Sequence, residues 1–76
     1  MPKLPVNLSG KEVVKALSKL DYEVDHQTGS HMILRHKEAP HRRLTIPNHP
    51  ELAAGTLRAI IRQAGLTREE FLELIE

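Results

Sequence analysis

The sequence contains no cysteine and no tryptophan, and it has only one phenylalanine and one tyrosine among its 76 residues. The absence of cysteine excludes disulfide bonds, thiolate metal ligands and cysteine nucleophiles. So short a chain with so few aromatic side chains predicts a single domain with a small core and modest stability. A core of this size leaves little room for a deep pocket, which favours a macromolecular partner over a small metabolite.

Long apolar runs are also missing. No stretch approaches the roughly 18 apolar residues that a membrane-spanning helix requires, and residues 1–10 lack the apolar segment of a signal peptide. We therefore expect a cytoplasmic protein that does not associate with membranes. Residues 1–76 are expected to form one domain, in which residues 1–7 are a loosely ordered N-terminal segment.

The charged residues nearly balance, with 11 basic and 10 acidic side chains and a formal net charge of +1. Their distribution is uneven, because residues 31–49 hold four basic residues and one acidic residue, together with four of the five histidines. A basic cluster of this kind attracts phosphate backbones even when the whole chain is nearly neutral. It can equally be the solvated rim of a sheet.

Local signals predict three helices. The segment 9–12 reads Ser-Gly-Lys-Glu, which is a capping box, and apolar residues follow at helical spacing from Val13 to Leu20. Thr56 is the predicted N-cap of a second helix, which Gly65 ends in a left-handed conformation. A second capping box at residues 67–70 begins a short third helix.

Three strands are predicted between the first two helices, over residues 22–27, 30–36 and 43–46. Thr28 and Gly29 form the first turn, in which Gly29 can take a positive φ, and the third strand ends before Pro47, which has no N–H to donate. Alternation in the first strand predicts one side that faces the core (Tyr22 and Val24) and one that faces away from it (Glu23, Asp25 and Gln27).

The element order α-β-β-β-α-α, with short links between the strands, predicts an α+β fold with a three-stranded antiparallel sheet. The helices can cover only one face of such a sheet, so the other face stays open. In the second strand, Met32 and Leu34 are expected to pack against the helices, which directs His31 and Arg35 to the open face.

An exposed imidazole, with an ordinary pKa of about 6.5, exchanges protons at neutral pH. Cleavage of RNA requires a base to deprotonate the 2′-hydroxyl and an acid to protonate the leaving 5′-oxygen, while cations stabilise the charge on the phosphate. His31 therefore is a candidate catalytic residue. Basic residues that can hold the phosphate backbone follow it in the chain: Arg35, Lys37, Arg42 and Arg43.

Other chemistries fit less well. The histidines of the basic segment are separated by 5, 5 and 8 residues with turns between them, which is unsuited to a structural zinc site. Ser30 is adjacent to His31, so the two side chains face opposite sides of a strand and form no hydrolytic triad. No glycine-rich phosphate loop is present. We expect neither a metal nor another cofactor.

Four segments together resemble a known family. Gln27-Thr28-Gly29-Ser30-His31 is similar to the glycine-serine-histidine motif of the HicA toxins, and Ile46-Pro47-Asn48-His49 is similar to their V/I-P-x-H segment. The stretch from Gly55 to Leu66 resembles their closing G-T-L-x-x-I-x-x-Q-A-G-L helix, and residues 9–17 fit the family's opening helix. The resemblance covers about residues 8–75.

The resemblance implies a fold like the double-stranded-RNA-binding domain. It implies a ribosome-independent mRNA interferase, which is the toxin of a type II toxin–antitoxin pair, and a HicB-type antitoxin that masks the active site. The catalytic histidine of the motif falls on His31, and the turn that presents it falls on Gly29 and Ser30. The second motif histidine falls on His49, with a structural or substrate-positioning role.

Two positions depart from the family pattern, which often has Gly in place of Asp21 and Arg in place of His26. The change to His26 weakens a phosphate contact. The second proton-transfer group also stays open, with His36, Lys37 and water as candidates. Two alternatives to an endoribonuclease are a non-catalytic RNA-binding module of the same fold and a partner-binding domain without RNA contact.

Overall fold

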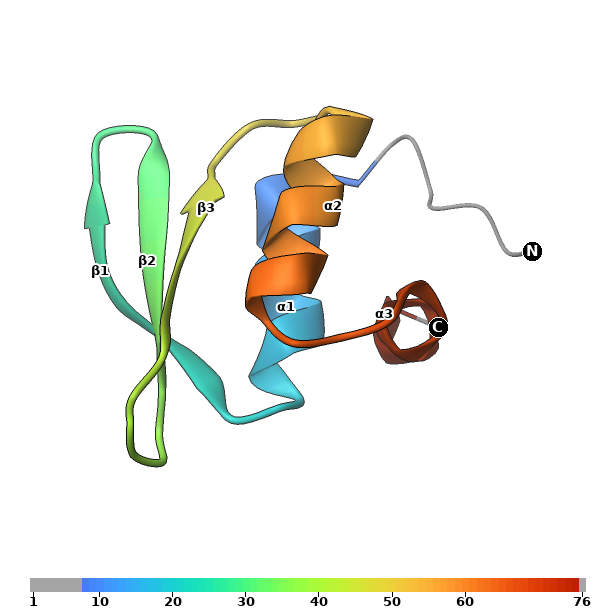
Figure 1. Cartoon of the computed structure of the whole chain (residues 1–76). Coiled ribbons are helices and arrows are strands. Elements are labelled where there is room, and N and C mark those ends of the chain that lie inside the picture. Colours follow the sequence, from blue (N-terminus) through green and yellow to red (C-terminus); the bar gives the residue numbers. More distant parts are fainter. Residues whose placement is uncertain (1–7, 76) are drawn as a thin grey trace.

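The structure is a computed structural model and describes residues 8–75. The expected loosely ordered segment, residues 1–7, lies outside the described residues. Three helices and three strands follow one another in the predicted order, which confirms the α+β fold (Figure 1). Their bounds are α1 Gly10–Ser18, β1 Tyr22–Thr28, β2 His31–His36, β3 Arg43–Pro47, α2 Ala54–Gln63 and α3 Arg68–Ile75.

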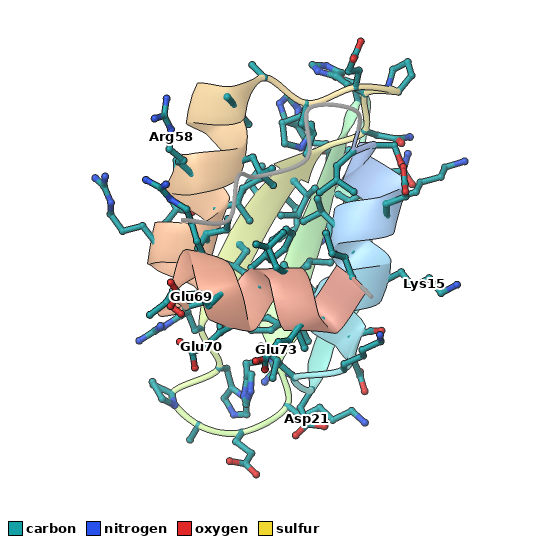
Figure 2. All side chains as sticks on the ribbon, turned by 90° about the vertical axis from the view of Figure 1, so that its right-hand side faces the viewer. Lys15, Asp21, Arg58, Glu69, Glu70 and Glu73 are labelled. Atoms are coloured by element: carbon teal, nitrogen blue, oxygen red, sulfur yellow. The ribbon has the colours of Figure 1, made fainter. Side chains whose placement is uncertain are left out.

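The elements form three layers. Helices α1 and α2 lie side by side on one face of the antiparallel sheet, and α3 crosses over their outer side (Figures 1 and 2). The core lies between these layers, and its seven most enclosed side chains come from all three of them: Val13, Leu17, Leu34, Leu44, Ile46, Leu57 and Phe71. Within residues 8–75, no helix covers the opposite face of the sheet, which is open as predicted.

Both predicted capping boxes are present. The Ser9 hydroxyl accepts from the Glu12 N–H at 3.1 Å, and the Glu12 carboxylate accepts from the Ser9 N–H at 3.1 Å. Thr67 and Glu70 make the same reciprocal pair at 3.1 and 2.9 Å at the start of α3. Gly65 has a φ of +76° directly after α2, so the predicted left-handed stop is also confirmed.

The start of α2 was predicted wrongly. Ala53 is its N-cap and makes no side-chain cap hydrogen bond, so Thr56 lies inside the first turn and is not the cap. The cause is tertiary. Leu52 is buried and its N–H donates to the Leu8 carbonyl at 2.8 Å, which holds the chain so that the helix begins directly after this contact.

The sheet has the order β1-β2-β3, and a β-bulge interrupts β1 between Val24 and His26. The extra residue reverses the alternation after it, because each one-residue shift moves side chains to the other face. Gln27 therefore pairs with Met32 on the helix-facing side, and His26 takes the open side. The predicted placement of Gln27 beside Glu23 was wrong.

The helices cover the sheet unequally. Val24 lies on the helix-facing side, as predicted, yet it is 48% exposed. Tyr22 is the one buried residue of the edge strand β1. At the other edge, β3 continues one residue further than predicted and includes Pro47. Proline is tolerated in an edge strand because the backbone groups on its outer side have no neighbouring strand to hydrogen-bond with, so the missing N–H of proline costs no ladder hydrogen bond.

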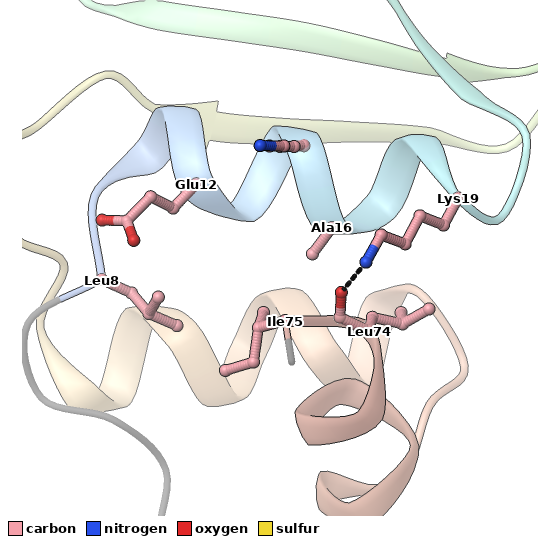
Figure 3. A pocket seen from close by; sticks show the side chains of 7 residues that line it. Leu8, Glu12, Ala16, Lys19, Leu74 and Ile75 are labelled. Atoms are coloured by element: carbon pink, nitrogen blue, oxygen red, sulfur yellow. Dashed lines mark hydrogen bonds between the residues drawn. The ribbon is translucent and has the colours of Figure 1, made fainter.

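One long-range hydrogen bond joins the outer helix to the layer beneath it. The ammonium group of Lys19, just after α1, donates to the Leu74 carbonyl in the last turn of α3 at 2.6 Å (Figure 3). A cation at a helix C-terminus satisfies an unpaired carbonyl and interacts favourably with the helix dipole. Beside this bond lies a hollow of about 400 Å³ between α1 and the end of α3.

Candidate functional site

His31 is the first residue of the central strand and directly follows the Gly29-Ser30 turn. Its side chain is exposed, and its cross-strand partners are Thr28 on β1 and Pro47 on β3. Gly29 has a φ of +52°, a conformation that a residue with a Cβ rarely adopts. The glycine therefore allows the tight turn that presents His31 at the end of the sheet.

Backbone contacts from distant parts of the chain hold this turn in place. The Asn48 N–H donates to the Ser30 carbonyl at 2.6 Å, and the Gly10 N–H donates to the His49 carbonyl at 3.0 Å. A Cβ at Gly10 would overlap the Pro47 carbonyl oxygen, so α1 can approach β3 this closely only through a glycine. Three separate sequence segments thus meet at one end of the sheet, and His49 takes part there through its carbonyl group.

The open face of the sheet carries three rows of paired residues. The row at the end of the sheet contains His31, the next contains His26, Ile33 and Thr45, and the last contains Glu23, Arg35 and Arg43. Arg35 and Arg43 are therefore neighbours on the open face. They lie four residues along their strands from the row of His31, which is roughly 13 Å at about 3.3 Å per residue.

Two of the other basic residues make contacts elsewhere. The Arg42 guanidinium donates to the Gln63 carbonyl at 3.2 Å, at the C-terminal end of α2, so it points toward the helices and not onto the open face. The ammonium group of Lys37 pairs with the Glu23 carboxylate at 3.2 Å, at the far end of the sheet from His31. The structure thus brings neither residue to the histidine.

His36 also lies far from His31, since five residues of one strand separate them by roughly 16 Å. The His36 ring accepts from the Glu38 N–H at 3.1 Å, and its edge contacts the Tyr22 ring at a centroid distance of 4.9 Å. These contacts give His36 a role in holding the hairpin between β2 and β3. His36 and Lys37 therefore both lie at the far end of the sheet from His31.

One pair of side chains on the open face was not predicted from the sequence. Asp25 and His26 would face opposite sides of a regular strand, but the bulge places both on the open side, where the two side chains meet at 2.9 Å. The hydrogen bond from His26 lowers the pKa of the Asp25 carboxyl group, and the positive charges of Arg43 and Arg35 lower it further. Strand alternation carries no signal for this pair, because a bulge depends on pairing with another strand.

Within residues 8–75, no group of three or more histidine, aspartate and glutamate side chains is arranged to hold a metal ion. No helix of this part of the chain is long and apolar enough to cross a membrane.

The sequence was compared with known protein families. The family described as HicA toxin of bacterial toxin–antitoxin systems matches residues 10–66. The matched segment runs from the start of α1 through the whole sheet to the end of α2, and it includes the Gly29-Ser30 turn, His31 and the segment that holds the turn. No curated protein matches the sequence.

Proposed function

The chain belongs to the HicA toxin family of bacterial toxin–antitoxin systems, and we propose that it is a ribosome-independent endoribonuclease that cleaves mRNA with His31 as a general acid or base. The observation that carries this proposal is the place of His31. It is an exposed imidazole that a glycine turn presents on the sheet face that no helix covers. An open face suits a long, flexible substrate better than a small one, since no pocket has to enclose it.

The reaction needs no group beyond those of the RNA and the protein. A base takes the proton of the 2′-hydroxyl, the O2′–P bond forms and the P–O5′ bond breaks, while an acid gives a proton to the 5′-oxygen. The products are a 2′,3′-cyclic phosphate and a free 5′-hydroxyl. A histidine is suited to either transfer because its ordinary pKa of about 6.5 lies close to neutral pH.

The arginines of the open face support the same function. Arg35 and Arg43 lie side by side there, and neither makes a salt bridge within residues 8–75. Two unpaired guanidinium groups on one face attract a polyanion and hold its phosphates. We propose that these residues bind the RNA backbone beside the cleaved nucleotide and that Gly29 and Ser30 contact it at His31.

Membership of a toxin family implies an antitoxin partner. We propose that this partner is a HicB-type antitoxin and that it covers the open face of the sheet. Occupation of that face would exclude RNA from His31 and from both arginines at once. One bound protein can block all of these residues because the whole proposed site lies on one surface.

The test is cleavage of mRNA by the purified protein in the presence of EDTA. The wild type should cleave, and His31→Ala should lose about 10²–10⁴-fold in rate, the usual contribution of a positioned proton-transfer group. His36→Ala is the matched control, because it removes a histidine from the far end of the same strand, and it should cleave at nearly the wild-type rate. Equal cleavage by the wild type and His31→Ala would overturn the proposed function.

One observation favours the alternative, a non-catalytic RNA-binding module. Arg58 and Arg62 of α2 and Arg68 of α3 line one hollow of about 310 Å³ on the helical side, and Figure 2 shows Arg58 on the outer side of its helix. This cluster lies on the helices and not on the open face of the sheet. If duplex RNA binds there, Arg58→Ala with Arg62→Ala should weaken a gel shift of duplex RNA, and prolonged incubation should leave the RNA uncut.

A further inference from the structure

The Asp25–His26 pair lies on the same open face as His31, one row of residues away. We propose that His26 is the second catalytic residue, which protonates the leaving 5′-oxygen while His31 acts as the base, and that Asp25 is the positioning residue that holds His26 for this step. This proposal rests on the proposed function, and it identifies the second proton-transfer group, which the sequence left open.

The strand register places the two imidazoles beside one another. Thr28 is directly opposite His31, and His26 is two residues before Thr28 in the same strand, with regular pairing between them. His26 and His31 are therefore diagonal neighbours on one face of an antiparallel pair. Such neighbours are about 7–8 Å apart, within reach of aromatic side chains. Two rings at this separation can reach a single phosphodiester group from its two sides.

The bulge gives His26 its partner. The Asp25 carboxylate lies 2.9 Å from Nδ1 of His26, so this nitrogen carries a proton and the other ring nitrogen is left for the substrate. The His26 side chain is 49% exposed and that of Asp25 is 38% exposed, so the ring stays open to RNA while its partner is more shielded.

His31 differs from His26 in its surroundings. Within the described chain its side chain makes no hydrogen bond and no ion pair. No side chain of the described residues therefore occupies its ring nitrogens, and one of them is left to accept the 2′-hydroxyl proton. The other charged groups of the open face are Glu23 on β1, Arg35 on β2 and Arg43 on β3, and they lie in the row farthest from His31.

The division of roles follows the requirements of the displacement. The attacking and leaving oxygens lie roughly in line through the phosphorus atom, so the base and the acid must act from opposite sides. His31 takes the 2′-hydroxyl proton as the O2′–P bond forms, and the His26 imidazolium gives its proton to O5′ as the P–O5′ bond breaks. Each histidine ends in the protonation state in which the other began, and exchange with water restores both.

The sharpest test uses an RNA oligonucleotide in which sulfur replaces the 5′-oxygen at a bond that the wild type cleaves. A thiolate leaves without protonation, so this substrate does not need the acid. We expect His26→Ala to lose about 10²–10⁴-fold on the normal oligonucleotide and to approach the wild-type rate on the sulfur substrate. His31→Ala should be slow on both, and the control His36→Ala should be fast on both.

The pH dependence of cleavage gives an independent readout. The wild type should show a bell-shaped profile, because the base must be neutral and the acid protonated. His26→Ala should lose the fall in rate at high pH, and His31→Ala should lose the fall at low pH. Asp25→Ala removes the partner that holds Nδ1 of His26, so it should slow cleavage of the normal oligonucleotide and recover on the sulfur substrate, and Asp25→Glu should restore the normal rate in part. A merely structural role for Asp25 would leave Asp25→Ala equally slow on both substrates.

The outcomes separate the two proposals. A wild type that leaves both substrates intact would overturn the proposed function. A wild type that cleaves while His26→Ala is equally fast on the normal oligonucleotide would overturn only the role of His26. If His26→Ala is equally slow on both substrates, His26 acts in binding and not in proton transfer, and its proposed role is also overturned. If sulfur rescues His31→Ala instead, the two proposed roles are reversed. Circular dichroism of each variant shows that it is folded.

Discussion

The two ends of the sheet contrast in how their histidines are used. At the turn end, which comprises residues 29–31 and 46–49, backbone hydrogen bonds hold the chain and the His31 side chain is left without a partner in the described structure. At the hairpin end, residues 36–42, the His36 and His41 rings both hydrogen-bond to backbone groups of the hairpin. The basic, histidine-rich segment of the sequence therefore differs between its two ends: the hairpin-end histidines bind the backbone, and the His31 side chain does not.

The largest effect is expected from breaking the turn end at Gly10. Gly10→Ala should lower the free energy of unfolding by about 1–3 kcal/mol, the usual cost of overpacking, because the new Cβ overlaps the Pro47 carbonyl. The matched control is Gly55→Ala in α2, where a Cβ meets nothing within 4 Å. It should raise the free energy of unfolding by roughly 0.5–1 kcal/mol. Urea denaturation measures both, and equal stabilities would show that the turn end is not tightly packed.

The two histidines of β2 should differ in stability. His36→Ala removes the acceptor of the Glu38 N–H and the contact with Tyr22, so we expect a loss of about 1 kcal/mol. His31→Ala removes no hydrogen bond or ion pair among residues 8–75 and should change the free energy of unfolding by less than about 0.5 kcal/mol. Thermal denaturation of the two variants checks this. If His31→Ala were the less stable of the two, the His31 side chain would contribute more to stability than that of His36, contrary to the contrast between the two ends of the sheet.

Arg42 and Arg43 are expected to differ in their contribution to RNA binding. If RNA lies on the open face, Arg43→Ala should weaken binding and reduce the slope of log K against log salt by about 1. Arg42→Ala should leave the slope nearly unchanged, because this guanidinium donates to the Gln63 carbonyl at the end of α2. Titrations at several salt concentrations measure the slopes. A larger change for Arg42→Ala would place the RNA on the hairpin end.

The smallest effect concerns acid stability. The pKa of Asp25 is lowered in the folded protein from its ordinary value of 3.8, mainly by the hydrogen bond with His26. A group with a lowered folded pKa stabilises the fold above its ordinary pKa, and this contribution is lost as the pH falls through the folded pKa. The wild type should therefore be slightly more stable than Asp25→Asn at neutral pH. The difference should vanish in acid, which unfolding curves at several pH values would detect.

Local features of the sequence were sufficient for much of the fold. Both capping boxes and the left-handed Gly29 and Gly65 were predicted correctly. These features depend on residues within a few positions of each other, so the sequence alone carries them. The same is true of the open face, since three helices of this size cover only one side of the sheet.

The rest depended on contacts between distant residues. The bulge in β1 follows from pairing with β2, and it alone places Asp25 beside His26 on the face of His31. The early start of α2 follows from the bond between Leu52 and Leu8, and the contact of Gly10 with Pro47 joins α1 to β3. The sequence by itself determined the order of the elements and the local signals that begin and end most of them. Only the tertiary structure decided which side chains accompany His31, because strand register is set by the pairing of whole strands and not by neighbouring residues.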